Sequence, residues 1–110
     1  MRYGFRAIVF KVKTYHNGHE YVDLGLSVKW ATCNIGANTP EEYGGYYAWG
    51  EIETKSIYDW TTHKYYDSTT KTFLKYNDWW HQGGVHDFKT TLDRSDDVAH
   101  INWGGNWRMP

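Results

Sequence analysis

The sequence predicts a small α+β domain that is mostly β, with an N-terminal β-hairpin, short helices and long loops. Trp, Tyr and Phe make up 19% of the 110 residues, and eleven residues are glycine against two prolines. Such ring-rich, glycine-containing composition favours ordered strands and turns over disorder. Apolar and polar residues alternate near the N-terminus with the period of two that is typical of a half-buried strand. A chain of this length has room for one domain, which we take as residues 1–110.

The hairpin is predicted over residues 7–33. Ile8, Phe10 and Val12 alternate with Val9, Lys11 and Lys13, and Asn17-Gly18 follows. This dipeptide is a strong hairpin signal because both residues tolerate a positive φ. A long return strand is expected over residues 22–30, and Gly25 marks an expected bulge or bend within it. In this register His16 and His19 lie across the hairpin from each other.

Shorter elements are expected farther along the chain. A helical turn is predicted over residues 39–42, where Pro follows Thr and two acidic residues come next. A buried strand is expected over residues 46–50, after a pair of glycines. Residues 52–82 read as long loops with short extended pieces, because their polar and aromatic residues show no clean period. A short helix is expected over residues 93–100, with Ser95 as its N-cap.

Charge and cysteine content exclude several classes of protein. Twelve Lys and Arg against thirteen Asp and Glu give a net charge of −1, so we expect no direct nucleic-acid partner. Cys33 is the single cysteine, which excludes an intramolecular disulfide. No apolar run approaches the length of about 20 residues that a membrane helix needs, so no membrane partner is expected. No cleavable secretion signal is recognised at the N-terminus, which makes the cytoplasm the default compartment.

Three segments resemble a known family. They are residues 17–37 (NGHEYVDLGLSVKWATCNIGA), residues 40–51 (PEEYGGYYAWGE) and residues 96–110 (DDVAHINWGGNWRMP). Together they are similar to the Fibrobacter succinogenes major paralogous domain, which is abundant in surface lipoproteins of gut Bacteroidetes. The closing Trp107-Arg108-Met109-Pro110 is similar to the Trp-Arg-Leu-Pro-Thr signature of C-type-lectin-like folds.

The resemblance implies a C-type-lectin-like fold and a place at the cell surface. Members of the family usually carry a secretion or lipid-anchor segment upstream, and their domain usually continues after Arg-Met-Pro through a helix and more strands. The resemblance therefore covers only the front half of the domain, and we expect a partial, truncated C-type-lectin-like domain. An incomplete core and an exposed sheet edge would favour a homo-oligomer or capture by a partner.

Aromatic side chains are the candidate binding surface. Rings give large contact areas at low entropic cost, and Trp and Tyr are enriched at binding hot spots. Trp79 and Trp80 are adjacent, so on a strand they point to opposite faces and one of them is expected at the surface. The alternative is that the rings form the core of a chain poor in Leu and Ile. The predicted ligand-binding residues are Trp79, Trp80, Trp60, Tyr76 and Glu51, the last as a carboxylate that could grip a sugar hydroxyl.

No catalytic, metal or cofactor site is predicted. His16 and His19 could supply two imidazole ligands, but no third ligand is close in the sequence. The acidic residues over 93–97 lack the alternation of a calcium loop and are better explained by helix capping. Glu51 has no second carboxylate with which to form a glycosidase pair. Cys33 has no neighbouring base and no Cys-x-x-Cys partner, so we expect it to be buried and inert.

These observations favour a non-enzymatic binding module that recognises a protein or a glycan through exposed aromatic residues. A second hypothesis is a small intracellular or phage-linked protein that binds and inhibits a macromolecular effector such as a nuclease. The small size and the lack of a recognised signal motivate it. A third hypothesis is a structural fragment that self-associates through its unfinished sheet.

Overall fold

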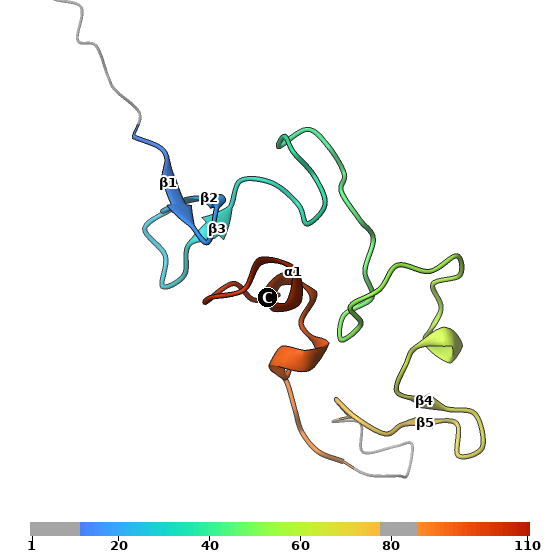
Figure 1. Ribbon diagram of the computed structural model, residues 1–110. Coiled ribbons are helices and arrows are strands. Elements are labelled where there is room, and N and C mark those ends of the chain that lie inside the picture. The colour runs from blue at the N-terminus through green and yellow to red at the C-terminus, as the bar shows by residue number, and fades with distance from the viewer. Residues whose placement is uncertain (1–11, 78–85) are drawn as a thin grey trace, which may run out of the picture.

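The computed structural model describes residues 12–77 and 86–110, and over these ranges the architecture is mainly β. Two small antiparallel sheets are accompanied by short helices and long loops, which confirms the predicted mainly-β class. Figure 1 shows the C-terminal helix α1 (Val98–Trp103) between the two sheets. Among the described residues, no helix combines the length and the apolar character that crossing a membrane requires.

The first sheet has three antiparallel strands in the order β1-β2-β3. They are β1 (Thr14–His16), β2 (His19–Val22) and β3 (Trp30–Ala31). β1 and β2 form the predicted hairpin, in which His16 pairs with His19 as expected. Asn17-Gly18 closes it with φ values of 49° and 77°, the positive values that a tight two-residue turn requires. The part of the predicted hairpin over residues 7–11 lies outside the described residues.

The long return strand predicted over residues 22–30 is wrong. β2 ends at Val22, and the chain turns before it comes back as β3, where Trp30 pairs with Val22. The Asp23 Oδ1 accepts a hydrogen bond from the Gly25 N–H at 2.9 Å, and Gly25 has a φ of 75°. An Asp side chain that bonds the backbone two residues later stabilises a turn. The apolar alternation in this segment therefore belongs to two short strands joined by a turn.

The second sheet is a small hairpin made of β4 (Tyr66–Asp67) and β5 (Thr72–Phe73). The Asp67 carboxylate holds the connecting turn, because it accepts hydrogen bonds from Thr69 N and Thr70 Oγ1, each at 3.0 Å. A short helix, η1 (Trp60–Thr62), precedes this sheet and is capped by the Asp59 side chain. These elements are the short pieces predicted within the loop-rich region over residues 52–82.

Two helices replace the single helix predicted over residues 93–100. They are η2 (Arg94–Asp96) and α1, separated by Asp97. Asp97 caps α1 by accepting a hydrogen bond from His100 N at 3.0 Å, so the prediction of Ser95 as the cap is wrong. Asp97 takes this role because the buried pair Val98 and Ala99 begins directly after it.

No strand forms over residues 46–50, contrary to the prediction. Gly50 is buried with a φ of 91°, and the Trp49 indole N–H donates to Pro110 O at 2.9 Å. Side-chain contacts of this kind, and not a ladder of backbone bonds, fix the segment. The predicted turn over residues 39–42 is present as one turn, closed by a hydrogen bond from Glu42 N to Thr39 O at 3.2 Å.

The apolar core of the described residues is small. Val98 and Ala99 are the buried hydrophobic residues, and Asp96 and Asp97 are buried beside them. None of the five tryptophans in the described ranges is fully buried, so their rings do not form the enclosed core considered above as an alternative. Large apolar side chains therefore remain partly open to solvent around the two sheets.

Candidate functional site

Three of the five residues predicted to bind a ligand lie in the described part of the chain. Trp79 and Trp80 lie outside the described residues. Trp60 is 57% exposed on η1, and its ring meets the ring of Tyr66 edge-on at a centroid distance of 5.4 Å. This position leaves the indole open to solvent. The other two predicted residues, Glu51 and Tyr76, are both engaged within the chain.

The Glu51 carboxylate uses both oxygens inside the molecule. Its Oε1 forms an ion pair with Lys55 Nζ at 2.5 Å, and its Oε2 accepts a hydrogen bond from Lys64 N at 3.3 Å. Lys55 Nζ also donates to Thr62 O at 3.1 Å, which ties the carboxylate to η1. Glu51 therefore bridges two loops, a role that the sequence did not indicate.

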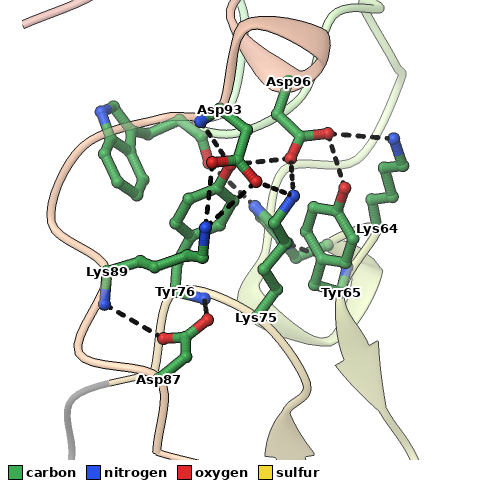
Figure 2. A network of polar contacts seen from close by, with 10 residues as sticks. Lys64, Tyr65, Lys75, Tyr76, Asp87, Lys89, Asp93 and Asp96 are labelled. Atoms are coloured by element: carbon green, nitrogen blue, oxygen red, sulfur yellow. Dashed lines mark hydrogen bonds and ion pairs between the residues drawn. The ribbon is translucent and has the colours of Figure 1, made fainter.

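Tyr76 belongs to a network of polar contacts centred on Asp96 (Figure 2). The Asp96 residue is only 1% exposed. Its carboxylate accepts hydrogen bonds from the hydroxyls of Tyr65 at 2.5 Å and Tyr76 at 2.7 Å. It also forms ion pairs with Lys75 Nζ at 2.6 Å and Lys64 Nζ at 3.3 Å. Four donors from two segments, residues 64–65 and 75–76, thus converge on one buried carboxylate.

Two further carboxylates extend this network toward the surface. Asp93 pairs with Lys75 Nζ at 2.7 Å and Lys89 Nζ at 3.0 Å, and its backbone N–H donates to the Tyr76 hydroxyl at 2.9 Å. Asp87 accepts a hydrogen bond from Tyr76 N at 2.9 Å. Tyr76 is therefore fixed at its backbone and at its hydroxyl. Its positive φ of 57° is held by these contacts.

The charge states of the network follow from its geometry. Burial raises the pKa of the Asp96 carboxyl. Hydrogen bonds from Lys75, Tyr65 and Tyr76 together lower it by more, so the pKa lies below the usual value for Asp. Hydrogen bonds to Asp93 and Asp96 raise the pKa of Lys75 above its ordinary value. Burial, together with the bond to Asp96, raises the pKa of Tyr76. All three groups therefore keep a fixed protonation state near neutral pH, which suits a structural role better than proton transfer.

A cleft of about 980 Å³ opens beside the first sheet. Its walls come from β3 and the residues before it, from the loop over residues 33–47, and from the C-terminal residues 103–110. Residues 90–92 and the hairpin residues His16 and Tyr21 complete them. Three of its rings are well exposed: Trp30 at 42%, Tyr43 at 79% and Tyr46 at 66%. Sequence analysis did not select these rings, although all three lie in the segments that carry the family resemblance.

Glycines and backbone contacts shape the loop wall of the cleft. Gly45 N donates to Ile35 O at 2.8 Å, and Asn34 Nδ2 donates to Tyr43 O at 3.2 Å. Gly44 adopts a φ of 71°, and a Cβ added there would collide with the Ile35 carbonyl oxygen. The close approach of the two halves of this loop therefore requires glycine, and the Asn34 side chain holds the backbone of Tyr43.

The hairpin and the C-terminal segment pack together at the other side of the cleft. The His19 ring stacks on Trp103 at a centroid distance of 4.3 Å, and Trp103 meets Trp107 edge-on at 5.0 Å. His16 Nε2 accepts a hydrogen bond from Asn106 N at 2.9 Å, and the Trp107 indole donates to His16 O at 2.8 Å. Both histidines thus hold the C-terminal segment. Within the described ranges, no three His, Cys, Asp or Glu side chains gather where they could hold a metal ion.

No protein-family model, curated protein or solved structure matches this chain.

Proposed function

We propose that this chain is a non-enzymatic binding module that recognises a protein or a glycan through exposed aromatic side chains. The observation that supports this proposal is the cleft, because Trp30, Tyr43 and Tyr46 keep 42%, 79% and 66% of their surface exposed on its walls. Concave surfaces lined by rings with a few polar groups are typical ligand sites. Exposed Tyr and Trp also provide the contact area that dominates protein interfaces.

The side chains around the cleft favour binding over turnover. Among the described residues, no Asp or Glu lines it, so it offers no carboxylate pair for acid–base chemistry. His16 is the one imidazole on its described walls, and its Nε2 is occupied by the Asn106 N–H. Cys33 also lines the cleft, where it is half-buried and not fully buried as expected, and its Sγ lies 3.7 Å from Thr32 Oγ1.

We also propose that the chain has a C-type-lectin-like fold, as the resemblance of its motifs implies. The three segments that carry the resemblance contact one another pairwise in the structure, which supports their acting as one unit. The contacts are Gly45 N with Ile35 O at 2.8 Å, the Trp49 indole with Pro110 O at 2.9 Å, and the stacked rings of His19 and Trp103.

Substitution of one exposed ring tests the proposal. The native chain is screened on arrays of glycans and of peptides, and the affinity of each hit is measured for Tyr43→Ala and for Tyr15→Ala. Tyr15 is a matched control because it is 58% exposed but lies on β1, away from the cleft walls. We expect Tyr43→Ala to lower the affinity about tenfold, which corresponds to about 1.4 kcal/mol, and Tyr15→Ala to leave it unchanged. Equal losses in both variants would contradict a role for the cleft.

The same variants separate the remaining hypotheses. If the ligand is a second copy of the chain, sedimentation will show a mass that rises with concentration, and Tyr43→Ala will abolish the rise. If the ligand is a macromolecular effector, the native chain will lower the activity of that effector and Tyr43→Ala will not. Trp60→Ala tests the surface selected from the sequence, because Trp60 is exposed and does not line the cleft.

A further inference from the structure

We infer that the cleft binds an acidic segment of a partner protein, held in an extended conformation along the free edge of β3. The inference rests on the proposed function and adds the charge and the backbone shape of the ligand. Two independent features carry it: the sign of the charge on the cleft walls and the orientation of the backbone at Ala31.

The cleft carries positive charge without a compensating acidic side chain. Lys29 and Arg108 line it, and no described Asp or Glu does. Arg108 makes no ion pair or side-chain hydrogen bond with the residues of 12–77 and 86–110. Lys29 Nζ lies over the Tyr21 ring, 5.1 Å from its centroid. The whole chain has a net charge of −1, so this positive region is local and favours a carboxylate-bearing partner.

The edge of β3 offers a backbone donor and a backbone acceptor. Thr32 N donates to Glu20 O at 3.2 Å, on the side that faces β2. Because successive residues of an antiparallel strand direct their polar groups to opposite sides, the Ala31 N–H and C=O point away from β2. Among residues 12–77 and 86–110, β3 is an outer strand of its sheet, and Ala31 lines the cleft. An extended peptide pairs with such an edge, whereas a sugar has no matching backbone.

Strand pairing also defines the side-chain pattern of the ligand. Alternate side chains of an added strand point to the same face. The cleft offers such a peptide two cations, Lys29 and Arg108, for its carboxylates, and the rings of Trp30 and Tyr46 for its apolar side chains. The expected ligand therefore alternates acidic residues with aliphatic or aromatic ones.

A synthetic peptide tests the charge. A labelled peptide of about eight residues, a usual strand length, alternates Glu with Val, and its control carries Gln in place of Glu. Fluorescence anisotropy at low salt measures both. We expect the Glu peptide to bind at least about tenfold more tightly than the Gln peptide, and Arg108→Gln and Lys29→Gln each to weaken it about tenfold. Lys71→Gln is the matched control, because Lys71 is an exposed cation outside the cleft.

Backbone methylation tests the strand pairing without changing the protein. Two versions of the Glu peptide carry N-methyl groups on alternate amides, one on the odd-numbered residues and the other on the even-numbered residues. Only one of these two sets of amides faces β3, so we expect one version to lose at least about tenfold in affinity and the other to bind as before. Equal behaviour of the two versions would overturn pairing along this edge.

Failure of this inference is distinguishable from failure of the proposed function. If polygalacturonate binds with the same dependence on Arg108 while the Glu peptide does not, the cleft takes an acidic glycan and the peptide inference is overturned. If no acidic probe binds but Tyr43→Ala still weakens a neutral ligand, the inference fails and the binding module stands. If every ligand is insensitive to both Tyr43→Ala and Arg108→Gln, both are overturned.

Discussion

The two sheets both pack against the C-terminal part of the chain, but by different kinds of contact. The first sheet meets it through rings: His19 stacks on Trp103, and Trp103 meets Trp107. The second sheet and the residues flanking it meet it through charge, because Lys64 and Lys75 converge on the buried carboxylate of Asp96.

The described part of the chain buries few aliphatic residues, and the difference shows that two kinds of contact, between rings and between charges, stabilise its two sheets. Ring contacts depend mainly on contact area, and they leave neighbouring rings free to line a cleft. A buried carboxylate depends on the charge of each partner, and losing one partner leaves an uncompensated charge. We therefore expect the second sheet to be the rigid, pH-dependent region and the first sheet to be the one that can serve a ligand.

The largest expected effect comes from Asp96→Asn. Removing the charge leaves two lysines without their buried partner, and we expect a loss of about 3 kcal/mol in the free energy of unfolding. Urea denaturation followed by Trp fluorescence measures it. Asp23→Asn is the control, because Asp23 accepts one turn hydrogen bond from Gly25 N that an Asn oxygen can also accept. Equal losses in the two variants would remove the distinction drawn between the regions.

A fall in pH is expected to have the next largest effect on the free energy of unfolding. The pKa of Asp96 is held below its ordinary value, and so is that of Asp93, through its bonds to Lys75 and Lys89. An unfolded Asp has a pKa of about 3.9, so the stability that these groups contribute is complete above that pH and is lost as the pH falls through their folded pKa values. Lys75 has a raised pKa, so its contribution is present below a pH of about 10.4 and is lost at higher pH.

Unfolding curves between pH 2 and pH 7 test this expectation, with signals assigned to each sheet by NMR. The β4–β5 signals should change first as the pH falls below about 4, and Asp96→Asn should show a weaker dependence there. A loss of the β1–β3 signals ahead of the β4–β5 signals would contradict the assignment of charge to the second sheet.

Trp103→Ala tests how much the ring contacts of the first sheet contribute to stability. The substitution removes the stack with His19 and the edge contact with Trp107, and we expect a loss of about 2 kcal/mol because the Trp103 side chain is only half-buried. Trp60→Ala, which removes an exposed ring on η1, should change the free energy of unfolding by less than about 0.5 kcal/mol.

The smallest expected effect distinguishes two glycines near the first sheet. Gly25 and Gly44 have similar φ values of 75° and 71°, but only Gly44 has backbone where a Cβ would lie. Gly44→Ala should therefore cost about 1 kcal/mol more than Gly25→Ala, because it adds a backbone collision to the shared conformational strain. Thermal denaturation compares the two variants. Equal losses of stability would mean that the loop around Gly44 accommodates the added Cβ without strain.

Sequence patterns predicted the features that depend on neighbouring residues. Asn17-Gly18 closes the hairpin, and the mainly-β class with short helices is observed. The return strand and the strand over residues 46–50 were wrong, since Asp23 and Gly25 make a turn and Trp49 bonds Pro110. Apolar alternation alone does not show where a strand is broken by a side-chain contact.

What the sequence by itself determined is therefore local: a turn that accepts positive φ at two successive residues, and acidic residues placed to cap short helices. These depend on atoms a few bonds apart, so neighbouring residue types suffice to specify them. The tertiary structure alone decided which of the twelve Lys and Arg residues reach Asp96, and which rings line the cleft. Tyr65 and Tyr76 lie 31 and 20 residues from Asp96, and such long-range meetings depend on how the whole chain packs.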